Sequence, residues 1–203
     1  MTRELDRFEE LLGDLLEISR HDAGVADLSP AKMDARAPIE AAWQHTRHLA
    51  DELDVEVNFI VPDEPVQIEG DSRRIERVIR NLIANAVDHS EGNPVTVELT
   101  QNDEAVAITV TDEGIGLKPG EEDLVFNRFW RADKSRKRHS GGTGLGLAIA
   151  REDALLHKGT LDAAGTVNVG SQFRLVLPRD PRTGFVTAPV DLKAPTARTA
   201  KGA

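Results

Sequence analysis

The sequence of 203 residues lacks cysteine, and it also lacks any long hydrophobic run. Without cysteine, the chain cannot form a disulfide framework or a thiolate metal site, and this composition suits a reducing compartment. No apolar stretch approaches the roughly 18 residues that a transmembrane helix requires, so the sequence predicts neither a membrane span nor a signal peptide. We therefore expect no membrane contact by this segment.

Positive charge is scarce relative to negative charge. The chain has 25 Lys and Arg residues and 35 Asp and Glu residues, which gives a formal net charge of −10. Because affinity for nucleic acids comes mainly from Lys and Arg, this balance argues against a nucleic-acid partner. Two common phosphate-binding patterns are missing as well: there is no G-x-x-x-x-G-K-S/T, and the glycine-rich stretch lacks the βαβ setting of a dinucleotide fingerprint.

Hydrophobic periodicity predicts a mixed α/β chain. Apolar residues recur every three or four positions over 3–23, which predicts an amphipathic helix that ends at Gly24. Further helices are predicted over 39–53 and after the capping pair Asp71-Ser72. Strands are predicted over 55–61, 95–100, 105–111, 160–164 and 171–177. This order favours a mixed sheet with helices on one face, preceded by a helical arm and followed by a disordered tail rich in Pro, Thr, Ala and Lys.

A glycine-rich stretch at 141–146 runs directly into an apolar, alanine-rich segment. Glycines allow backbone N–H groups to approach a phosphate, and the start of a helix adds partial positive charge. The junction can therefore bind an anion. Taken alone, the pattern is more typical of ordinary turn chemistry.

Two further segments carry polar groups that suit a nucleotide. Asn81 and Asn85 lie four residues apart, so they share one helix face at the edge of the apolar arc. A neutral amide oxygen there suits Mg²⁺, although a random Asn pair is more often simply solvated. Asp112 directly follows a predicted strand and precedes Gly114 and Gly116. Its carboxylate can accept a hydrogen bond from an exocyclic amine, although Asp and Gly are also common in an ordinary turn at the end of a strand.

The segment between these motifs and the glycine-rich stretch combines aromatic and basic residues. Phe126, Phe129 and Arg131 come first, followed by a basic run over 134–139. Such a loop can fold over a polyphosphate, with the aromatic residues as anchors and the cations near the charge. A solvated basic loop with buried aromatic residues explains the same pattern.

Taken in chain order, four segments resemble the N, G1, F and G2 boxes of the ATP-binding domain of two-component sensor histidine kinases: residues 81–90, 112–117, 126–131 and 142–148. The helical arm is similar to the second helix of that family's dimerisation and phosphotransfer hairpin. The resemblance implies an α/β fold, the two-layer α/β sandwich of the Bergerat (GHKL) ATP-binding type. Two stretches, at 4–12 and 126–133, are especially similar to an actinobacterial subfamily of these kinases.

The resemblance also implies a domain organisation. Its parts are a partial hairpin helix at 1–26, a linker at 27–34, the ATP-binding catalytic domain at 35–178 and the disordered tail at 179–203.

The same resemblance implies ATP and Mg²⁺ as cofactors and assigns residue roles. Asn85 would coordinate Mg²⁺ with support from Asn81, both acting in catalysis, and Asp112 would hold the adenine amino group. Gly114 and Gly116 would let the chain pass close to the base, and Phe126 and Phe129 would anchor a lid shaped by the later glycines. The implied ATP-binding residues are Asn81, Asn85, Asp112, Gly114, Gly116, Phe126, Phe129, Arg131, Gly142, Thr143, Gly144, Leu145, Gly146 and Leu147.

Two departures from the family pattern stand out. Many members carry Lys where this chain has Asp88, so we expect cations from the run at 134–138 to neutralise the phosphates instead. None of the six histidines lies in the His-Glu-Leu-Arg-Thr-Pro-like context of the family's phosphoacceptor. His21 ends the first predicted helix and is expected at the surface. The phosphoacceptor, the sensor and the membrane spans are therefore expected upstream, outside this chain. The resemblance thus implies that the chain is the cytoplasmic portion of a membrane-anchored kinase and would bind ATP without labelling itself.

The implied activity is that of a protein-histidine kinase, with a response regulator as partner and a homodimer formed through the hairpin. Two alternatives remain. One is a non-catalytic ATP-binding or scaffold module that pairs through its N-terminal helix; the intact Asn85, Asp112 and glycines argue against it. The other is a related ATPase or serine kinase of the same fold; the F-box segment and the helical arm argue against that.

Overall fold

The computed structural model describes residues 2–130 and 143–196. Its helices are α1 (Thr2–Asp22), α2 (Arg36–Glu52), α3 (Ser72–His89), α4 (Glu121–Leu124) and α5 (Gly146–Leu156). Its strands are β1 (Ala31–Asp34), β2 (Val57–Ile60), β3 (Gln67–Gly70), β4 (Val95–Gln101), β5 (Ala105–Asp112), β6 (Thr160–Thr166) and β7 (Gly170–Pro178). The helices and strands predicted from periodicity are therefore present.

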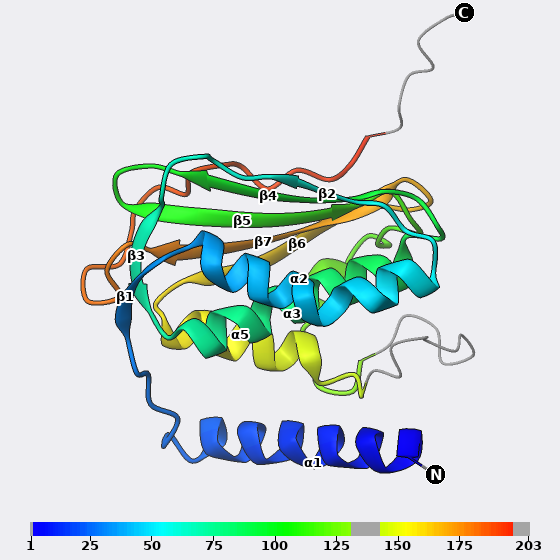
Figure 1. Ribbon diagram of the computed structural model, residues 1–203, viewed down its shortest axis with the longest axis horizontal. Coiled ribbons are helices and arrows are strands. Elements are labelled where there is room, and N and C mark those ends of the chain that lie inside the picture. Colours follow the sequence, from blue (N-terminus) through cyan, green and yellow to red (C-terminus); the bar gives the residue numbers. More distant parts are fainter. Residues whose placement is uncertain (1, 131–142, 197–203) are drawn as a thin grey trace, which may run out of the picture.

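A five-stranded sheet forms one layer and helices α2, α3 and α5 form the next (Figure 1). The strand order is β2-β4-β5-β7-β6, with β2 parallel to β4 and the remaining neighbours antiparallel. The predicted hairpin is the β4–β5 pair, in which Val95 lies opposite Asp112. This register places Asp112 at the end of a central strand, directly before the loop that leads to the site.

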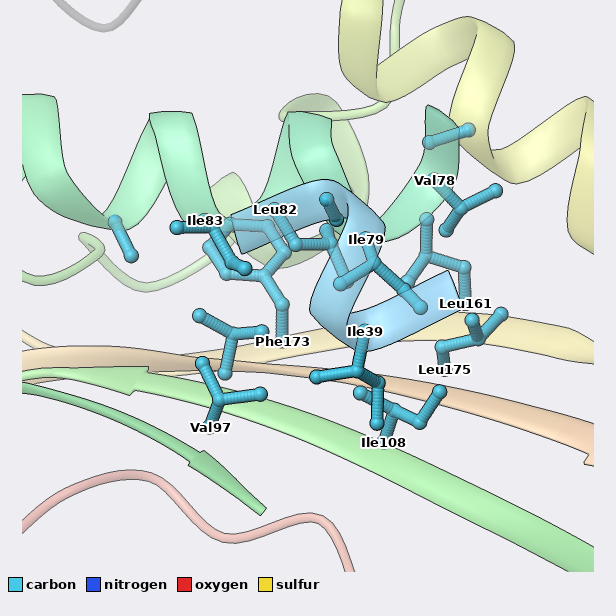
Figure 2. Close-up of a cluster of buried hydrophobic side chains, with 14 of the residues drawn as sticks. Ile39, Val78, Ile79, Leu82, Ile83, Val97, Ile108, Leu161, Phe173 and Leu175 are labelled. Carbon is cyan, nitrogen blue, oxygen red and sulfur yellow. The ribbon is translucent and has the colours of Figure 1, made fainter. Parts of the chain in front are cut away.

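Helix α3 supplies much of the core between the two layers (Figure 2). Its side chains Ile75, Val78, Ile79, Leu82 and Ile83 are almost fully buried against the sheet. Each such side chain contributes roughly 1.5–3 kcal/mol relative to an exposed position. The helix begins where the sequence predicts, because the Asp71 carboxylate accepts hydrogen bonds from the backbone N–H groups of the next turn. The buried stripe therefore fixes which polar face of α3 points towards the site.

Helix α1 lies on the side of the helical layer away from the sheet (Figure 1). Ile18 is 8% exposed and packs with Leu145 and Ile149 at the start of α5. The other described large apolar side chains of the helix include four that are exposed: Phe8, Leu12, Leu15 and Leu16. The predicted arm thus uses one apolar residue to dock on the site-forming helix and leaves a second apolar stripe uncovered by the described chain.

Two parts of the predicted domain organisation need correction. The segment expected to be a linker at 27–34 contains β1, which pairs antiparallel with β3; neither short strand was predicted. Within the segment expected to be a disordered tail, residues 179–196 form no helix or strand, but Phe185, Ala188 and Val190 pack on the outer face of the sheet. Strand β5 is almost wholly buried, so its outer face needs a cover as well as its inner one. The remaining residues of the expected tail, 197–203, lie outside the described part.

Candidate functional site

A cavity of about 170 Å³ opens between α3, the loop after β5 and the glycine-rich segment that begins α5. It brings together residues that are far apart in the sequence. Of the predicted site residues, those lining it are Asn81, Asn85, Gly116, Thr143, Gly144, Gly146 and Leu147. Residues not predicted for the site also line it, among them Asp14, Arg77, Arg80, Trp130 and Ser171. Arg131 and Gly142 lie outside the described residues.

Asp112 is buried behind the residues that line the cavity. Its side chain is fully buried and accepts hydrogen bonds from Ser171 Oγ at 2.5 Å and from the Gly114 N–H at 3.0 Å. Burial raises the pKa of the Asp112 carboxyl, and these hydrogen bonds partly offset that rise. Ser171 itself lines the cavity, so it extends the Asp112 acceptor system to the surface that a ligand would meet. Sequence reasoning missed Ser171 because it reads only as part of a strand.

Gly114 and Gly116 are required by the packing of the chain itself. A Cβ on Gly114 would overlap the backbone carbonyl of His89, and one on Gly116 would overlap that of Thr166. Gly116 also has φ of +67°, which side chains rarely adopt. The glycines thus let the loop after β5 press against the end of α3 and against β6, whether or not a base lies beside them.

The two asparagines of α3 differ in their surroundings. The Asn81 amide donates to the carbonyl of Gly146 at 2.9 Å, which ties α3 to the first residue of α5. Asn85 lines the cavity, and its side chain makes no hydrogen bond to the described residues. Asn85 is therefore available to a ligand, whereas Asn81 already holds the glycine-rich segment in place.

The phenylalanines of the F-box segment do not play one role. Phe126 is 6% exposed and packs edge-on against Phe173, with ring centroids 6.2 Å apart. The guanidinium of Arg151 lies 4.9 Å from the centroid of the Phe126 ring. Phe129 is 60% exposed, so its side chain is not packed in the core as that of Phe126 is. Its backbone N–H instead donates to the Gly144 carbonyl at 2.9 Å and so holds the glycine-rich segment.

The glycine-rich segment is also held by helix α1. The Thr143 hydroxyl donates to the Asp14 carboxylate at 2.9 Å, and Asp14 lines the cavity. Leu145, predicted as a ligand contact, is fully buried and packs with Ile18 and Ile149. An acidic side chain from the arm therefore faces the cavity beside the segment predicted to receive phosphates, a contact that no sequence pattern predicts.

Burial raises the pKa of Asp14 above its usual value of 3.8, although its bond from Thr143 and two nearby arginines lower it in part. A carboxyl whose pKa is raised by folding weakens the native state once it is charged. The variant Asp14→Asn keeps an acceptor for Thr143 and removes the charge. We expect Asp14→Asn to have the higher free energy of unfolding, by a margin over the wild type that grows as the pH rises from about 4 towards neutrality. Urea unfolding of both proteins at several pH values measures this margin.

Asp22→Asn, on the same helix, is a control of opposite sign. The pKa of Asp22 is lowered by its hydrogen bonds from Arg128, at 2.6 and 2.8 Å. Its contribution is therefore present above the unfolded pKa and is lost as the pH falls, so this variant should lose stability relative to the wild type at neutral pH. A flat pH profile for Asp14→Asn would contradict the expectation.

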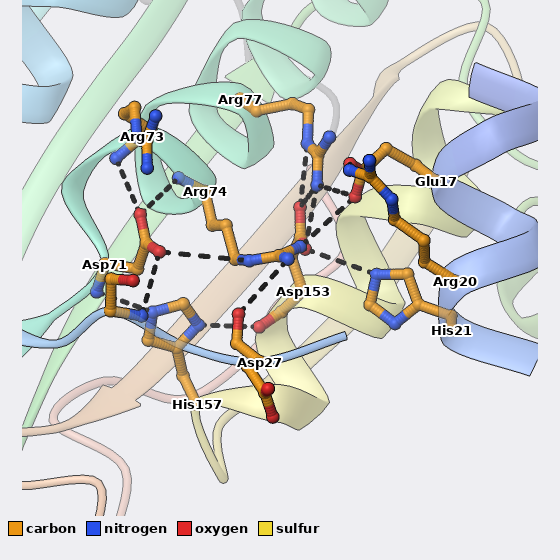
Figure 3. A network of polar contacts seen from close by, with 11 residues as sticks. Glu17, Arg20, His21, Asp27, Asp71, Arg73, Arg74, Arg77, Asp153 and His157 are labelled. Atoms are coloured by element: carbon orange, nitrogen blue, oxygen red, sulfur yellow. Dashed lines mark hydrogen bonds and ion pairs between the residues drawn. The ribbon is translucent and has the colours of Figure 1, made fainter. Parts of the chain in front are cut away.

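Charged residues from three helices form a network beside the cavity (Figure 3). Asp153 of α5 is fully buried and pairs with Arg74 at 2.8 Å and with Arg77 at 2.7 Å. Both arginines also reach Glu17 of α1. The network therefore fixes α1, α3 and α5 relative to one another around Arg77, which lines the cavity.

His21 joins the same network, contrary to the prediction that it lies at the surface. Its side chain is 5% exposed, and Nε2 lies 3.5 Å from Asp153 Oδ1. That separation is within range of an ion pair but does not meet hydrogen-bond geometry, so Nε2 is left without a hydrogen bond to the described residues. The reason for the burial is tertiary, because the end of α1 docks on α5.

Comparison with known families agrees with this geometry. The family model of histidine kinase-, DNA gyrase B- and HSP90-like ATPases matches residues 70–181. The chain belongs to this ATPase family, with a mixed α/β fold that matches the catalytic domains of its histidine kinases. Within residues 2–130 and 143–196, no helix is both long enough and apolar enough to cross a membrane.

Sensor histidine kinases of the MtrB type are among the relatives of this chain. MtrB of Mycolicibacterium paratuberculosis is 55% identical over 193 residues, which cover 95% of this chain and 34% of that protein. MtrB of Mycobacterium tuberculosis is 54% identical with the same coverage. The chain thus spans about a third of the length of the curated relatives that it matches, and the predicted resemblance to an actinobacterial subfamily is confirmed.

Solved structures point the same way. The mycobacterial sensor histidine kinase MprB shares 32% identity with a TM-score of 0.63, covering 73% of this chain and 96% of that one. Full-length ShkA in complex with AMPPNP shares 25% identity with a TM-score of 0.74, covering 91% of this chain and 38% of ShkA. The chain is therefore homologous to the ATP-binding catalytic domains of sensor histidine kinases.

Proposed function

We propose that this chain binds Mg-ATP and delivers its γ-phosphoryl group to a histidine on a dimerisation helix outside the chain, as part of a two-component sensor histidine kinase. The observation that carries the proposal is the convergence of Asn85, the glycine-rich segment and the Asp112–Ser171 pair on one cavity. These groups come from three separate regions of the sequence. A scaffold module would not need them at a common cavity.

Different polar groups of the cavity would bind the base and the phosphates of the nucleotide. The adenine amino group would donate a hydrogen bond to the Asp112–Ser171 pair, in which Ser171 lines the cavity and Asp112 lies buried behind it. The glycine-rich segment, with Thr143 to Leu147 at the start of α5, would present backbone N–H groups and partial positive charge to the phosphates. Phosphoryl transfer depends mostly on positioning and charge stabilisation. In the transfer, the bond from the γ-phosphorus to the bridging oxygen of ADP breaks as a bond to an imidazole nitrogen forms.

The donor set fits a magnesium ion that arrives with the nucleotide. Among the described residues, no cluster of three or more Asp, Glu, His or Cys side chains could hold a metal ion by itself. Mg²⁺ commonly keeps several waters and relies on substrate phosphates for much of its coordination, so one protein ligand can suffice. Asn85, with its unengaged amide in the cavity wall, would supply that ligand, and Asn81 would support it by holding Gly146. The ion would neutralise charge on the phosphates.

Membership of this class supports proposals for the partners and the location of the complete protein. We propose that the phosphorylated histidine passes its phosphoryl group to a response regulator, that the complete kinase is a homodimer through its helical hairpin, and that this portion works in the cytoplasm. The exposed apolar stripe of α1 at Phe8, Leu12, Leu15 and Leu16 supports the hairpin, because such a stripe requires a partner helix. The acidic net charge supports the absence of a nucleic-acid partner.

Calorimetric titration of Mg-ATP into the chain and its Asn85→Ala variant tests the proposal. We expect the wild type to bind and Asn85→Ala to bind at least about tenfold more weakly, since a lost bond to a charged ligand costs roughly 1.5–3 kcal/mol. Asn58→Ala, on edge strand β2 and away from the cavity, is the matched control and should bind normally. Absence of binding by the folded wild type would refute the proposal, and equal binding by wild type and Asn85→Ala would refute the role of Asn85.

A further inference from the structure

The two ends of the cavity lie at different positions along α3, one near its C-terminal end and the other near Arg80. At the C-terminal end of this helix, the Ile115 N–H donates to the His89 carbonyl, which brings the loop after Asp112 against the helix end. Arg80 lies nine residues earlier, about 13 Å along the helix axis, and next to Asn81, which holds the glycine-rich segment. A nucleotide with its base at Asp112 would therefore extend its phosphates towards Arg80.

Four charged side chains line the cavity: Asp14, Arg77, Arg80 and Asp88. Asp14, which accepts a hydrogen bond from Thr143 of the glycine-rich segment, would oppose a polyphosphate there. Arg77 is already committed, because its guanidinium makes hydrogen bonds to Asp153 and to Glu17. Moving it to a phosphate would leave the fully buried Asp153 with fewer partners, which is costly.

Arg80 is the cation of the cavity lining that is least engaged by the described residues. Its closest described ionic contact is with Glu76 at 3.8 Å, one turn back on the same helix, it also interacts with the charge of Asp14, and its side chain is 41% exposed. A helical pair of this kind stabilises by only about 0.3–0.5 kcal/mol. The guanidinium can therefore leave Glu76 for a phosphate at little cost and offer two parallel N–H bonds.

We propose that Arg80 binds the terminal phosphates of ATP and supplies the positive charge that offsets Asp14 at this end of the cavity. The inference rests on the proposed function and deepens it. It assigns the neutralising role to α3, whereas the sequence pointed to the basic run at 134–138, which lies outside the described residues. Because the charge acts on the outer phosphates, Arg80 favours ATP over AMP.

Calorimetric titrations of ATP and AMP, each with Mg²⁺, test this assignment in the wild type, Arg80→Ala, Arg80→Lys and Arg73→Ala. Arg80→Ala should bind ATP at least about tenfold more weakly, as expected for a lost charge-assisted hydrogen bond, with AMP affinity changed less than about twofold. Arg80→Lys should recover part of the loss, because it keeps the charge without the fork. Arg73→Ala removes an exposed arginine from the same helix, outside the cavity lining, and should match the wild type.

The possible results distinguish failure of the Arg80 assignment from failure of the proposed function. If the folded wild type bound neither nucleotide, the proposed function would fail. If it bound ATP and Arg80→Ala bound ATP equally well, the Arg80 assignment alone would fail and the cations of the run at 134–138 would be the next residues to replace. Equal losses for ATP and AMP, or an equal loss in Arg73→Ala, would also overturn the assignment, since they would indicate a local structural change or a general charge effect.

Discussion

Replacing Asp153 with alanine is expected to lower the free energy of unfolding by about 3 kcal/mol or more, the largest loss expected for a single substitution in the charged network. Asp153 is fully buried and is the common partner of Arg74, Arg77 and His21. Breaking a buried ion pair by removing one partner costs roughly 3–5 kcal/mol, because it leaves buried charge uncompensated. The two arginines are 15% and 21% exposed, so water can soften the loss and the lower end of that range applies.

Urea unfolding of the whole chain, followed by circular dichroism, measures this effect. Asp123→Ala is the matched control, because Asp123 is 93% exposed and lies 3.9 Å from its partner Arg151. A surface pair of this kind contributes little, so the control should unfold as the wild type does. Similar midpoints for all three proteins would mean that the network in Figure 3 does not hold the helices together.

Elements with a strong local pattern were predicted from the sequence. Helix α3 has a long apolar arc and an aspartate cap, and the hairpin β4–β5 alternates around a polar turn. Such patterns hold because burying one face of a helix or strand is a local requirement. Strands β1 and β3 have only four residues each and no such pattern, so they were missed.

Contacts between distant segments account for the other differences. The segment at 179–196 looks disordered by composition, yet it covers a strand that is buried on both faces. The burial of His21 and the position of Asp14 depend on the docking of α1, which no pattern within α1 specifies. Tertiary packing, and not local propensity, decides these features.

The sequence motifs predicted which residues belong to the candidate site but not which hydrogen bonds they make. Asn85, the glycine-rich segment and Ser171, the hydrogen-bond partner of the buried Asp112, line one cavity. The motifs did not reveal that Asn81 binds the Gly146 carbonyl or that Ser171 joins Asp112, because both contacts join segments more than 50 residues apart. A motif specifies residue types, whereas the partner of each polar atom follows only from the fold.

Gly116→Ala is expected to damage both the fold and the cavity, with a loss of at least about 2 kcal/mol in free energy of unfolding. A side chain at φ of +67° costs roughly 1–2 kcal/mol, and the new Cβ would also overlap the Thr166 carbonyl oxygen. Relief requires the loop after β5 to move away from β6. Because Gly116 lines the cavity, that movement should also weaken Mg-ATP binding by at least about tenfold, if lost contacts cost about 1.4 kcal/mol or more.

Gly120→Ala separates the two causes, because Gly120 has φ of +89° but no heavy atom within 4 Å of an added Cβ. This control carries the backbone cost without the overlap, so it should lose only about 1 kcal/mol and keep its nucleotide affinity. Thermal or urea unfolding, together with calorimetry, measures both quantities on the same samples. Equal losses in the two variants would show that backbone conformation alone requires glycine at 116, and the close approach to Thr166 would then have no energetic consequence.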